Sequence, residues 1–341
     1  MEANSKNLII GATTVMAQAT WDDGAIHTKE ELIDDFCPKT ASVADKALSC
    51  FGFGRNSVTQ RREWSVLPLG FDRLMGRMMY PGLIDSNGGL STDRTKKALV
   101  QSIVSDLKPL MKHQNFAWDI QVVSSGVMNA MALPGGKIVI CEGIIDEITN
   151  HVQGMLDGGK ITEAQAHKKI RSMLALVIGH EMAHSDVRHG AQSIQRTILV
   201  YIVLAIFFAV AKLMIFNSKS NCKTQEERNR LDGLSKLVNC AELLLSKVGM
   251  FFYKLAMSRK AESEADEVGM ERLFEAGYNY HNARELFEVF KAKSGASHVL
   301  SKFEMKVVNC LGSHPTAEVR LEQTKAHAEK FDSIRDARAR V

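Results

Sequence analysis

An apolar run from Met173 to Ile178 leads directly into the sequence His180-Glu181-Met-Ala-His184. Two histidines four residues apart lie on the same face of an α-helix, so both imidazoles can reach one metal ion. Glu181 lies next to His180 on that helix, close enough to act on a water at the ion without being a ligand. In an ordinary core helix, which is the alternative, three buried polar side chains without partners would each cost about 1–3 kcal/mol. We therefore predict a buried helix with a zinc site.

The spacing of His189 argues against a third metal ligand at that position. In the metzincin pattern the third histidine follows the first by ten residues and comes after a helix-breaking glycine. His189 instead follows His180 by nine residues and precedes Gly190. On a continuing helix it would lie about 180° from His180. We therefore predict that His189 is structural or faces solvent.

A tetrahedral catalytic zinc needs a third protein ligand, and the segment from Ser258 to Asp266 offers one. Glu262 and Asp266 are four residues apart and share a helical face. This spacing suits Glu262 as a ligand and Asp266 as an acceptor for the outer N–H of a ligating histidine. Glu264 lies about 200° from Glu262 around the helix and should point elsewhere. A solvated acidic helix face is the alternative that this cluster alone leaves open.

Two further motifs flank the His180–His184 motif and the Glu262 segment. Asn129-Ala130-Met-Ala-Leu133-Pro134-Gly135-Gly136 lies upstream, and His314-Pro315 with Arg320 lies downstream. Together with His180–His184 and the Glu262 segment, they occur in the order found in the CAAX-protease and HtpX-like family of membrane-associated gluzincins (peptidase family M, number forty-eight). The chain resembles this family over about residues 95–325, and within it the branch of the mitochondrial inner-membrane stress protease and its bacterial relatives.

The resemblance implies that His180, His184 and Glu262 bind one Zn²⁺ per chain and that Glu181 activates the water. His314 and Arg320 would lie over the site, where they could stabilise an oxyanion or block the water position. A helix-start turn is the alternative for His314-Pro315. Lys137–Cys141 would be the edge strand that pairs with an extended substrate backbone. The substrate-binding residues would be Asn129, Ala130, Pro134, Gly135 and Gly136.

The function implied is a zinc-dependent endopeptidase with protein or peptide substrates, acting in quality control at a membrane. Its mechanism would be hydrolysis by a zinc-activated water. The alternative is a latent zinc-binding protein with a chaperone-like or scaffolding role and gated or absent proteolysis.

The hydrophobic periodicity predicts a mainly α-helical fold with a small β-sheet (α+β). Helices are expected over 97–113, 142–156, 162–188 and onward to the C-terminus, and strands over 118–123 and 137–141. The resemblance adds a zincin-type core with the active-site helix beside the short sheet. We divide the chain into an irregular N-terminal region of unknown role (1–92), a metallopeptidase domain (93–330) and a basic C-terminal tail (331–341). Residues 8–19 match a cleaved signal only weakly, because Glu2 stands where such a signal is basic.

The segment from Thr197 to Phe216 has Lys212 as its one charged residue, and Arg196 and Lys219 flank it. A membrane span needs about 20 mostly apolar residues, so the segment is just long enough. We predict membrane association through 197–216, either integral or peripheral. A buried core helix or an apolar lid over the active site is the alternative. The segment Leu237 to Met257 is a poorer candidate because it carries three charged residues.

Composition excludes other classes of protein. The net charge of +4 over 341 residues is small, and no basic run interleaved with aromatics occurs, so we expect no nucleic-acid partner. The six cysteines form no Cys-x-x-Cys pair, which argues against a disulfide framework or a cysteine zinc site.

Overall fold

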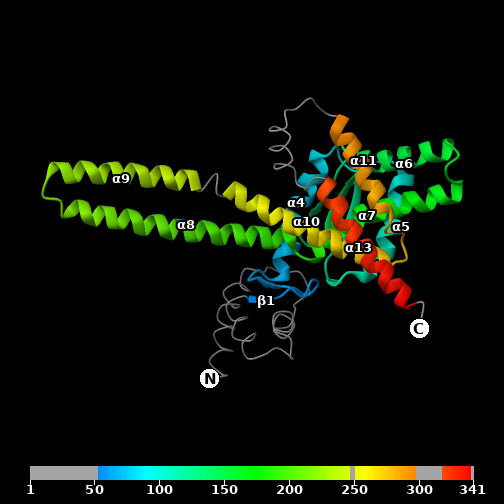
Figure 1. Cartoon of the computed structure of the whole chain (residues 1–341), viewed down its shortest axis with the longest axis horizontal. Coiled ribbons are helices and arrows are strands. Elements are labelled where there is room, and N and C mark those ends of the chain that lie inside the picture. The colour runs from blue at the N-terminus through cyan, green and yellow to red at the C-terminus, as the bar shows by residue number, and fades with distance from the viewer. Residues whose placement is uncertain (1–52, 246–249, 297–316, 339–341) are drawn as a thin grey trace, which may run out of the picture.

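The computed structural model describes residues 53–245, 250–296 and 317–338 (Figure 1). The described part is mainly helical, with a three-stranded sheet and a short hairpin, so the predicted fold class is confirmed. Its elements are β1 (Phe53–Arg55), β2 (Arg62–Trp64), α4 (Leu69–Ser86), α5 (Arg94–Leu107), the 3₁₀ turn η1 (Lys108–Leu110), β3 (Asp119–Val123), β4 (Ala130–Leu133), β5 (Lys137–Cys141), α6 (Glu142–Asp157), α7 (Glu163–Asp186), α8 (His189–Ser220), α9 (Gln225–Leu244), α10 (Met250–Glu275), α11 (Asn282–Ala296) and α13 (Ala317–Arg338).

The larger sheet has the strand order β3-β5-β4, with β5 parallel to β3 and antiparallel to β4. The expectation that Lys137–Cys141 is the edge strand is therefore wrong: this strand is central, and β4 is at the edge. The physical reason is visible in its composition, since Ile138 to Cys141 is apolar at every position and buried on both faces. Gly135 and Gly136, with φ of +76° and +80°, form the tight turn between β4 and β5.

The sheet has helices on both faces. Because successive strand residues point to opposite faces, Val139 and Cys141 pack with Tyr80 of α4, whereas Ile138 and Ile140 pack in the main core. That core is filled mostly by branched aliphatic side chains of α5, α6 and α7 together with residues of α11 and α13. The sheet therefore holds one flank of α7 in place.

Helix α4 forms where the sequence was expected to be irregular, and that expectation is wrong for residues 69–86. Gly76, Pro81 and Gly82 interrupt the helical pattern, which explains the weak periodicity. Packing on the sheet compensates for this interruption. The Tyr80 hydroxyl lies 2.9 Å from the Asp119 carbonyl oxygen and 3.0 Å from that of Ile138, and donates to the backbone there.

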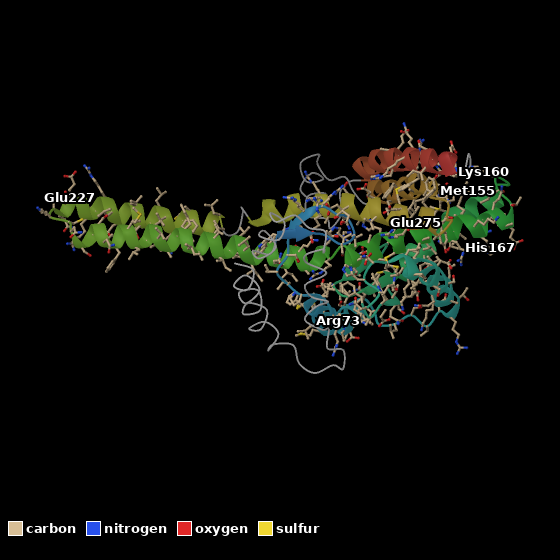
Figure 2. The ribbon with its side chains drawn as sticks, turned by 90° about the horizontal axis from the view of Figure 1, so that it is seen from below. Arg73, Met155, Lys160, His167, Glu227 and Glu275 are labelled. Atoms are coloured by element: carbon tan, nitrogen blue, oxygen red, sulfur yellow. The ribbon has the colours of Figure 1, made fainter. Side chains whose placement is uncertain are left out.

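Helices α8 and α9 form an antiparallel hairpin that extends away from the rest of the molecule, with Glu227 near its tip (Figures 1 and 2). Within the described residues, α8 is the one helix long and apolar enough to cross a membrane, and only 11% of its most apolar window is buried. This exposure contradicts the alternative of a buried core helix. The second apolar segment, 237–257, is divided between α9 and α10.

Some of the predicted regions and site residues lie partly or wholly outside the residues that the structure describes. Phe331, in the predicted basic tail, belongs to α13 and is 2% exposed in the main core. Residues 8–19 and His314 lie outside the described residues. Arg320 lies on α13, but its side chain is outside the description. The division into three regions stays a prediction.

Candidate metal centre

Helix α7 brings the two histidines of the central motif together. It starts at a capping box in which Thr162 and Gln165 satisfy each other's backbone N–H groups, and it runs through the core for 24 residues. His180 and His184 are one helical turn apart, with their Nε2 atoms 3.1 Å from each other. Their exposed fractions are small, because α7 is buried along nearly its whole second half.

Helix α10 supplies a carboxylate opposite the two imidazoles. The Oε2 atom of Glu262 lies 3.2 Å from His180 Nε2, and its Oε1 atom lies 3.2 Å from His184 Nε2. The three side chains offer ligand atoms that all lie within 4.8 Å of one another. Atoms bound at about 2.0–2.1 Å to a tetrahedral zinc are about 3.3 Å apart. The residues therefore fit a zinc ion in both spacing and donor type.

The Asp266 side chain lies behind His180. Its Oδ1 atom is 2.8 Å from His180 Nδ1, the nitrogen turned away from the other two ligand candidates. A proton on Nδ1 leaves the Nε2 lone pair free for a metal, and the carboxylate fixes the ring orientation. The predicted position of Asp266, one turn after Glu262 on the same helical face, is the position that the structure gives.

Two glycines allow α7 and α10 to approach closely enough for this arrangement. A Cβ atom on Gly269 would lie 3.0 Å from the His180 backbone nitrogen and 3.1 Å from the Gly179 carbonyl carbon. A Cβ atom on Gly179 would lie 2.7 Å from Leu273 Cδ1. The helices thus cross with their backbones in contact, immediately beside the first ligand histidine.

Glu181 lines an open cleft next to the three ligand candidates. The cleft has a volume of about 300 Å³ and is bounded by β4 and the turn after it, by the end of α7, by the start of α8 and by the Glu262 segment of α10. Among the predicted substrate residues, Ala130 and Pro134 line this cleft. Gly135 and Gly136 lie in the turn beyond it, and the Asn129 carbonyl accepts from the Cys141 N–H. Ser185 Oγ donates to the Leu133 carbonyl at 2.9 Å, which ties α7 to the edge strand.

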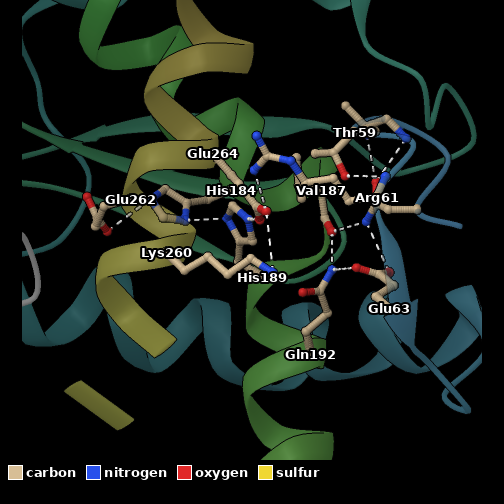
Figure 3. A network of polar contacts seen from close by, with 12 residues as sticks. Thr59, Arg61, Glu63, His184, Val187, His189, Gln192, Lys260, Glu262 and Glu264 are labelled. Carbon is tan, nitrogen blue, oxygen red and sulfur yellow. Dashed lines mark hydrogen bonds and ion pairs between the residues drawn. The ribbon is translucent and has the colours of Figure 1, made fainter. Parts of the chain in front are cut away.

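The position of His189 differs from the one derived for a continuing helix. Helix α7 ends at Asp186, and Arg188 adopts a left-handed conformation with φ of +67°. This turn changes the chain direction, so the His189 ring returns to the site. Its Nδ1 atom lies 2.9 Å from His184 Nδ1, and its Nε2 atom lies 3.2 Å from Glu264 Oε2 (Figure 3). His189 is 7% exposed, so its place is structural and not solvent-facing.

The left-handed turn at Arg188 is stabilised by its own side chain. The guanidinium is buried and donates to Asp72 Oδ2 at 2.7 Å and to the Leu67 carbonyl at 2.6 Å. Left-handed backbone costs energy for any residue with a Cβ atom, and these charge-assisted bonds offset that cost.

The pKa values of His189 and Glu264 are both lowered from their ordinary values. Burial lowers the pKa of His189 to about 4, although the hydrogen bond to Glu264 works in the opposite direction. Burial would raise the pKa of Glu264, but hydrogen bonds from His189 and Arg61 outweigh it and lower this pKa to about 2. A neutral imidazole therefore faces a carboxylate at neutral pH.

Glu264 is not among the three ligand candidates, but its side chain lines the same cleft and takes part in a second group of contacts, with His189 and Arg61. Arg61 Nη1 donates to Glu264 Oε1 at 2.7 Å across 203 residues of sequence. No local pattern in the sequence indicated Arg61, because its partner lies on a distant helix. The position of His189 could not be predicted because the sequence does not show that the helix breaks at Arg188.

Comparison with known proteins gives consistent matches. The family model of Peptidase family M48 matches residues 94–328. The mitochondrial metalloendopeptidase OMA1 of Arabidopsis thaliana is 27% identical over 175 residues, which cover 51% of this chain and 26% of that protein. The OMA1 of Schizosaccharomyces pombe is 23% identical over 268 residues, or 78% of this chain and 64% of that protein. The human metalloendopeptidase OMA1, mitochondrial, is 25% identical over 153 residues. The chain thus matches between 22% and 64% of the length of these relatives.

Proposed function

This chain belongs to peptidase family M48, as its motifs predicted, and we propose that it is a zinc-dependent endopeptidase that acts in protein quality control at a membrane. Relatives named as mitochondrial metalloendopeptidases support the hydrolytic activity. The observation that supports it most directly is the convergence of His180, His184 and Glu262 beside Glu181 in an open cleft. A metal is expected from the family, and the histidine and carboxylate donors favour zinc.

In the proposed mechanism, His180, His184 and Glu262 would hold one Zn²⁺, which would lower the pKa of a water toward about 7 and polarise the scissile carbonyl. Glu181 takes the proton from the attacking water and then delivers it to the leaving amine. Asp266 orients His180 through the contact to Nδ1. We assign to His314 and Arg320 the role of donors to the oxyanion, on the basis of the family motif.

β4 is the outer strand of the sheet in the described part of the chain, and its outer edge supports a binding mode for an extended peptide. β4 pairs with β5 on one side and faces the cleft on the other. A substrate backbone added to this edge would run past Glu181 and the three ligand candidates. Ala130 and Pro134 then contact the substrate directly. Asn129, Gly135 and Gly136 act by shaping the strand and its turn.

Metal removal tests the proposed activity. The purified full chain is expected to hold about one zinc per chain and to cleave casein. Treatment with 1,10-phenanthroline should reduce cleavage to background, and added Zn²⁺, but not Mg²⁺, should restore it. Metal analysis and gel-based cleavage assays measure both properties.

Zinc binding and casein cleavage can fail separately. A chain that binds no zinc under these conditions contradicts the proposal at its centre. A chain that binds zinc but cleaves nothing supports the latent, chaperone-like or scaffolding alternative.

We further propose membrane association through residues 197–216 of α8. Ile206, Phe207, Leu213 and Met214 are each 58–66% exposed, so an apolar surface extends along the helix. Water-exposed apolar surface of this extent marks an interaction site. A lipid bilayer suits it because the surface surrounds most of the helix, and Lys219 stands at its end as a suitable interfacial anchor.

Vesicle flotation tests the membrane proposal. The full chain is expected to float with phospholipid vesicles, and a variant with Ile206, Leu213 and Met214 changed to serine should remain at the bottom of the gradient. Changing the exposed Leu74 and Met78 of α4 to serine is the matched control, and these changes should leave flotation intact. Carbonate extraction then separates integral from peripheral association. Equal flotation of both variants would contradict a role for α8.

A further inference from the structure

The outer nitrogens of the two ligand histidines have different partners. His180 Nδ1 faces a carboxylate directly, that of Asp266, at 2.8 Å. His184 Nδ1 faces another imidazole, that of His189, at 2.9 Å. Since both Nε2 atoms face Glu262, each ligand histidine needs its proton on Nδ1 to present a lone pair toward a metal.

One arrangement of protons allows a hydrogen bond at each of the contacts that link His184, His189, Glu264 and Arg61. His184 Nδ1–H donates to the lone pair on His189 Nδ1. His189 is then protonated on Nε2 and donates to Glu264 Oε2 at 3.2 Å. The other oxygen of Glu264 accepts from Arg61 Nη1 at 2.7 Å. The chain of hydrogen bonds therefore runs from a ligand histidine to an arginine 50% exposed at the surface.

Arg61 comes from a part of the chain outside the family match, which begins at residue 94. It precedes β2 in the β1–β2 hairpin, and this hairpin is fastened to the turn between α7 and α8. The Asn56 side-chain amide donates to the Val187 carbonyl at 3.0 Å, and Gln192 Nε2 donates to Glu63 Oε2 at 2.7 Å (Figure 3). The hairpin therefore holds both the arginine and the turn that directs His189 into the site.

We propose that His189, Glu264 and Arg61 are positioning residues that fix the tautomer and ring orientation of His184, so that the β1–β2 hairpin completes the metal site. This inference rests on the proposed zinc site. A ligand imidazole whose outer N–H has a defined acceptor loses less freedom on binding a metal and is a more basic ligand. Here the acceptor is a neutral ring, and its own orientation depends on the carboxylate and the guanidinium behind it.

Zinc affinity of the full chain, measured by competition with a chromophoric chelator, tests the role of His189. His189→Ala removes the acceptor and should weaken zinc binding about 10–100-fold, the usual effect of losing an outer partner of a metal ligand. His189→Asn places an amide oxygen near the position of Nδ1, so it should recover most of the lost affinity. The absorption spectrum of the Co²⁺-loaded protein should change for His189→Ala and return toward that of wild type for His189→Asn.

A pair of glutamates tests the outer part of this series of hydrogen bonds, between His189 and Arg61. Arg61 contacts both Glu264 and Glu267, but of the two only Glu264 reaches His189. Glu264→Gln should weaken zinc binding about tenfold, whereas Glu267→Gln should leave it within about twofold. Arg61→Ala should also weaken it, although less than His189→Ala, since its head group is half exposed.

The outcomes separate this inference from the function on which it rests. If wild-type protein binds no zinc, the proposed function itself is wrong. If wild type binds zinc and His189→Ala binds it equally well with an unchanged Co²⁺ spectrum, the positioning role alone is overturned. Equal weakening by Glu264→Gln and Glu267→Gln would also overturn it, because the effect would then be one of general charge. Thermal unfolding of the metal-free variants checks the fold, and Arg61→Ala, at a half-exposed site, keeps the test valid if His189→Ala does not fold.

Discussion

Replacing Glu181 by glutamine is expected to abolish peptide cleavage while one zinc per chain stays bound. The amide has nearly the shape of the carboxylate, but it cannot take a proton from the attacking water. A positioned general base contributes about 10²–10⁴-fold to such a reaction, so the turnover number should fall by at least about 100-fold. Zinc content should not change, because the three ligand candidates do not include Glu181.

Glu163→Gln is the matched control for this experiment. Glu163 lies in the first turn of the same helix, with its side chain 83% exposed and far from the cleft. This variant should cleave casein at the wild-type rate. Full activity of Glu181→Gln would reject the proposed base. Zinc-loaded wild type and variant that are both inactive would instead favour the latent alternative, and His314→Ala would be the next variant to measure.

The parts of the site that follow from local spacing could be predicted from the sequence. His180 and His184 share a helical face whatever surrounds them, and the same holds for Glu262 and Asp266. The Lys137–Cys141 strand was predicted with its observed bounds, because a short apolar run after a Pro-Gly-Gly turn has few other conformations available.

The parts that depend on tertiary contacts could not be predicted. The helical geometry placed His189 opposite His180 because nothing in the sequence showed that the chain turns at Arg188. That turn depends on Asp72 and Leu67, more than 100 residues earlier in the chain. Arg61 was missed for the same reason. The edge position of β4 follows from the parallel addition of β3 to β5, which local patterns do not reveal.

Replacing Gly269 by leucine is expected to destabilise the protein and to release its metal together. At the crossing of α7 and α10, even a Cβ atom on Gly269 would meet backbone atoms of Gly179 and His180 at 3.0–3.2 Å. Backbone atoms cannot rotate away as a side chain can, so α10 must move. Overpacking of this kind typically costs about 1–3 kcal/mol of unfolding free energy.

The same movement should affect zinc binding, because Glu262 lies two turns before Gly269 on the face of α10 that meets α7. Metal–ligand distances in such sites lie within about 0.2 Å of their standard values, so a displaced Glu262 should lower zinc affinity at least about tenfold, as for a disturbed outer partner. Gly154→Leu is the matched control: Gly154 lies on α6, where an added Cβ atom would meet no neighbouring atom within 4 Å, and a better helix former there should add up to about 1 kcal/mol of stability. Urea unfolding and chelator competition measure the two effects. If Gly269→Leu lost stability but kept wild-type zinc affinity, the position of Glu262 would not depend on the close crossing of the two helices, and another contact would have to hold it against the histidines.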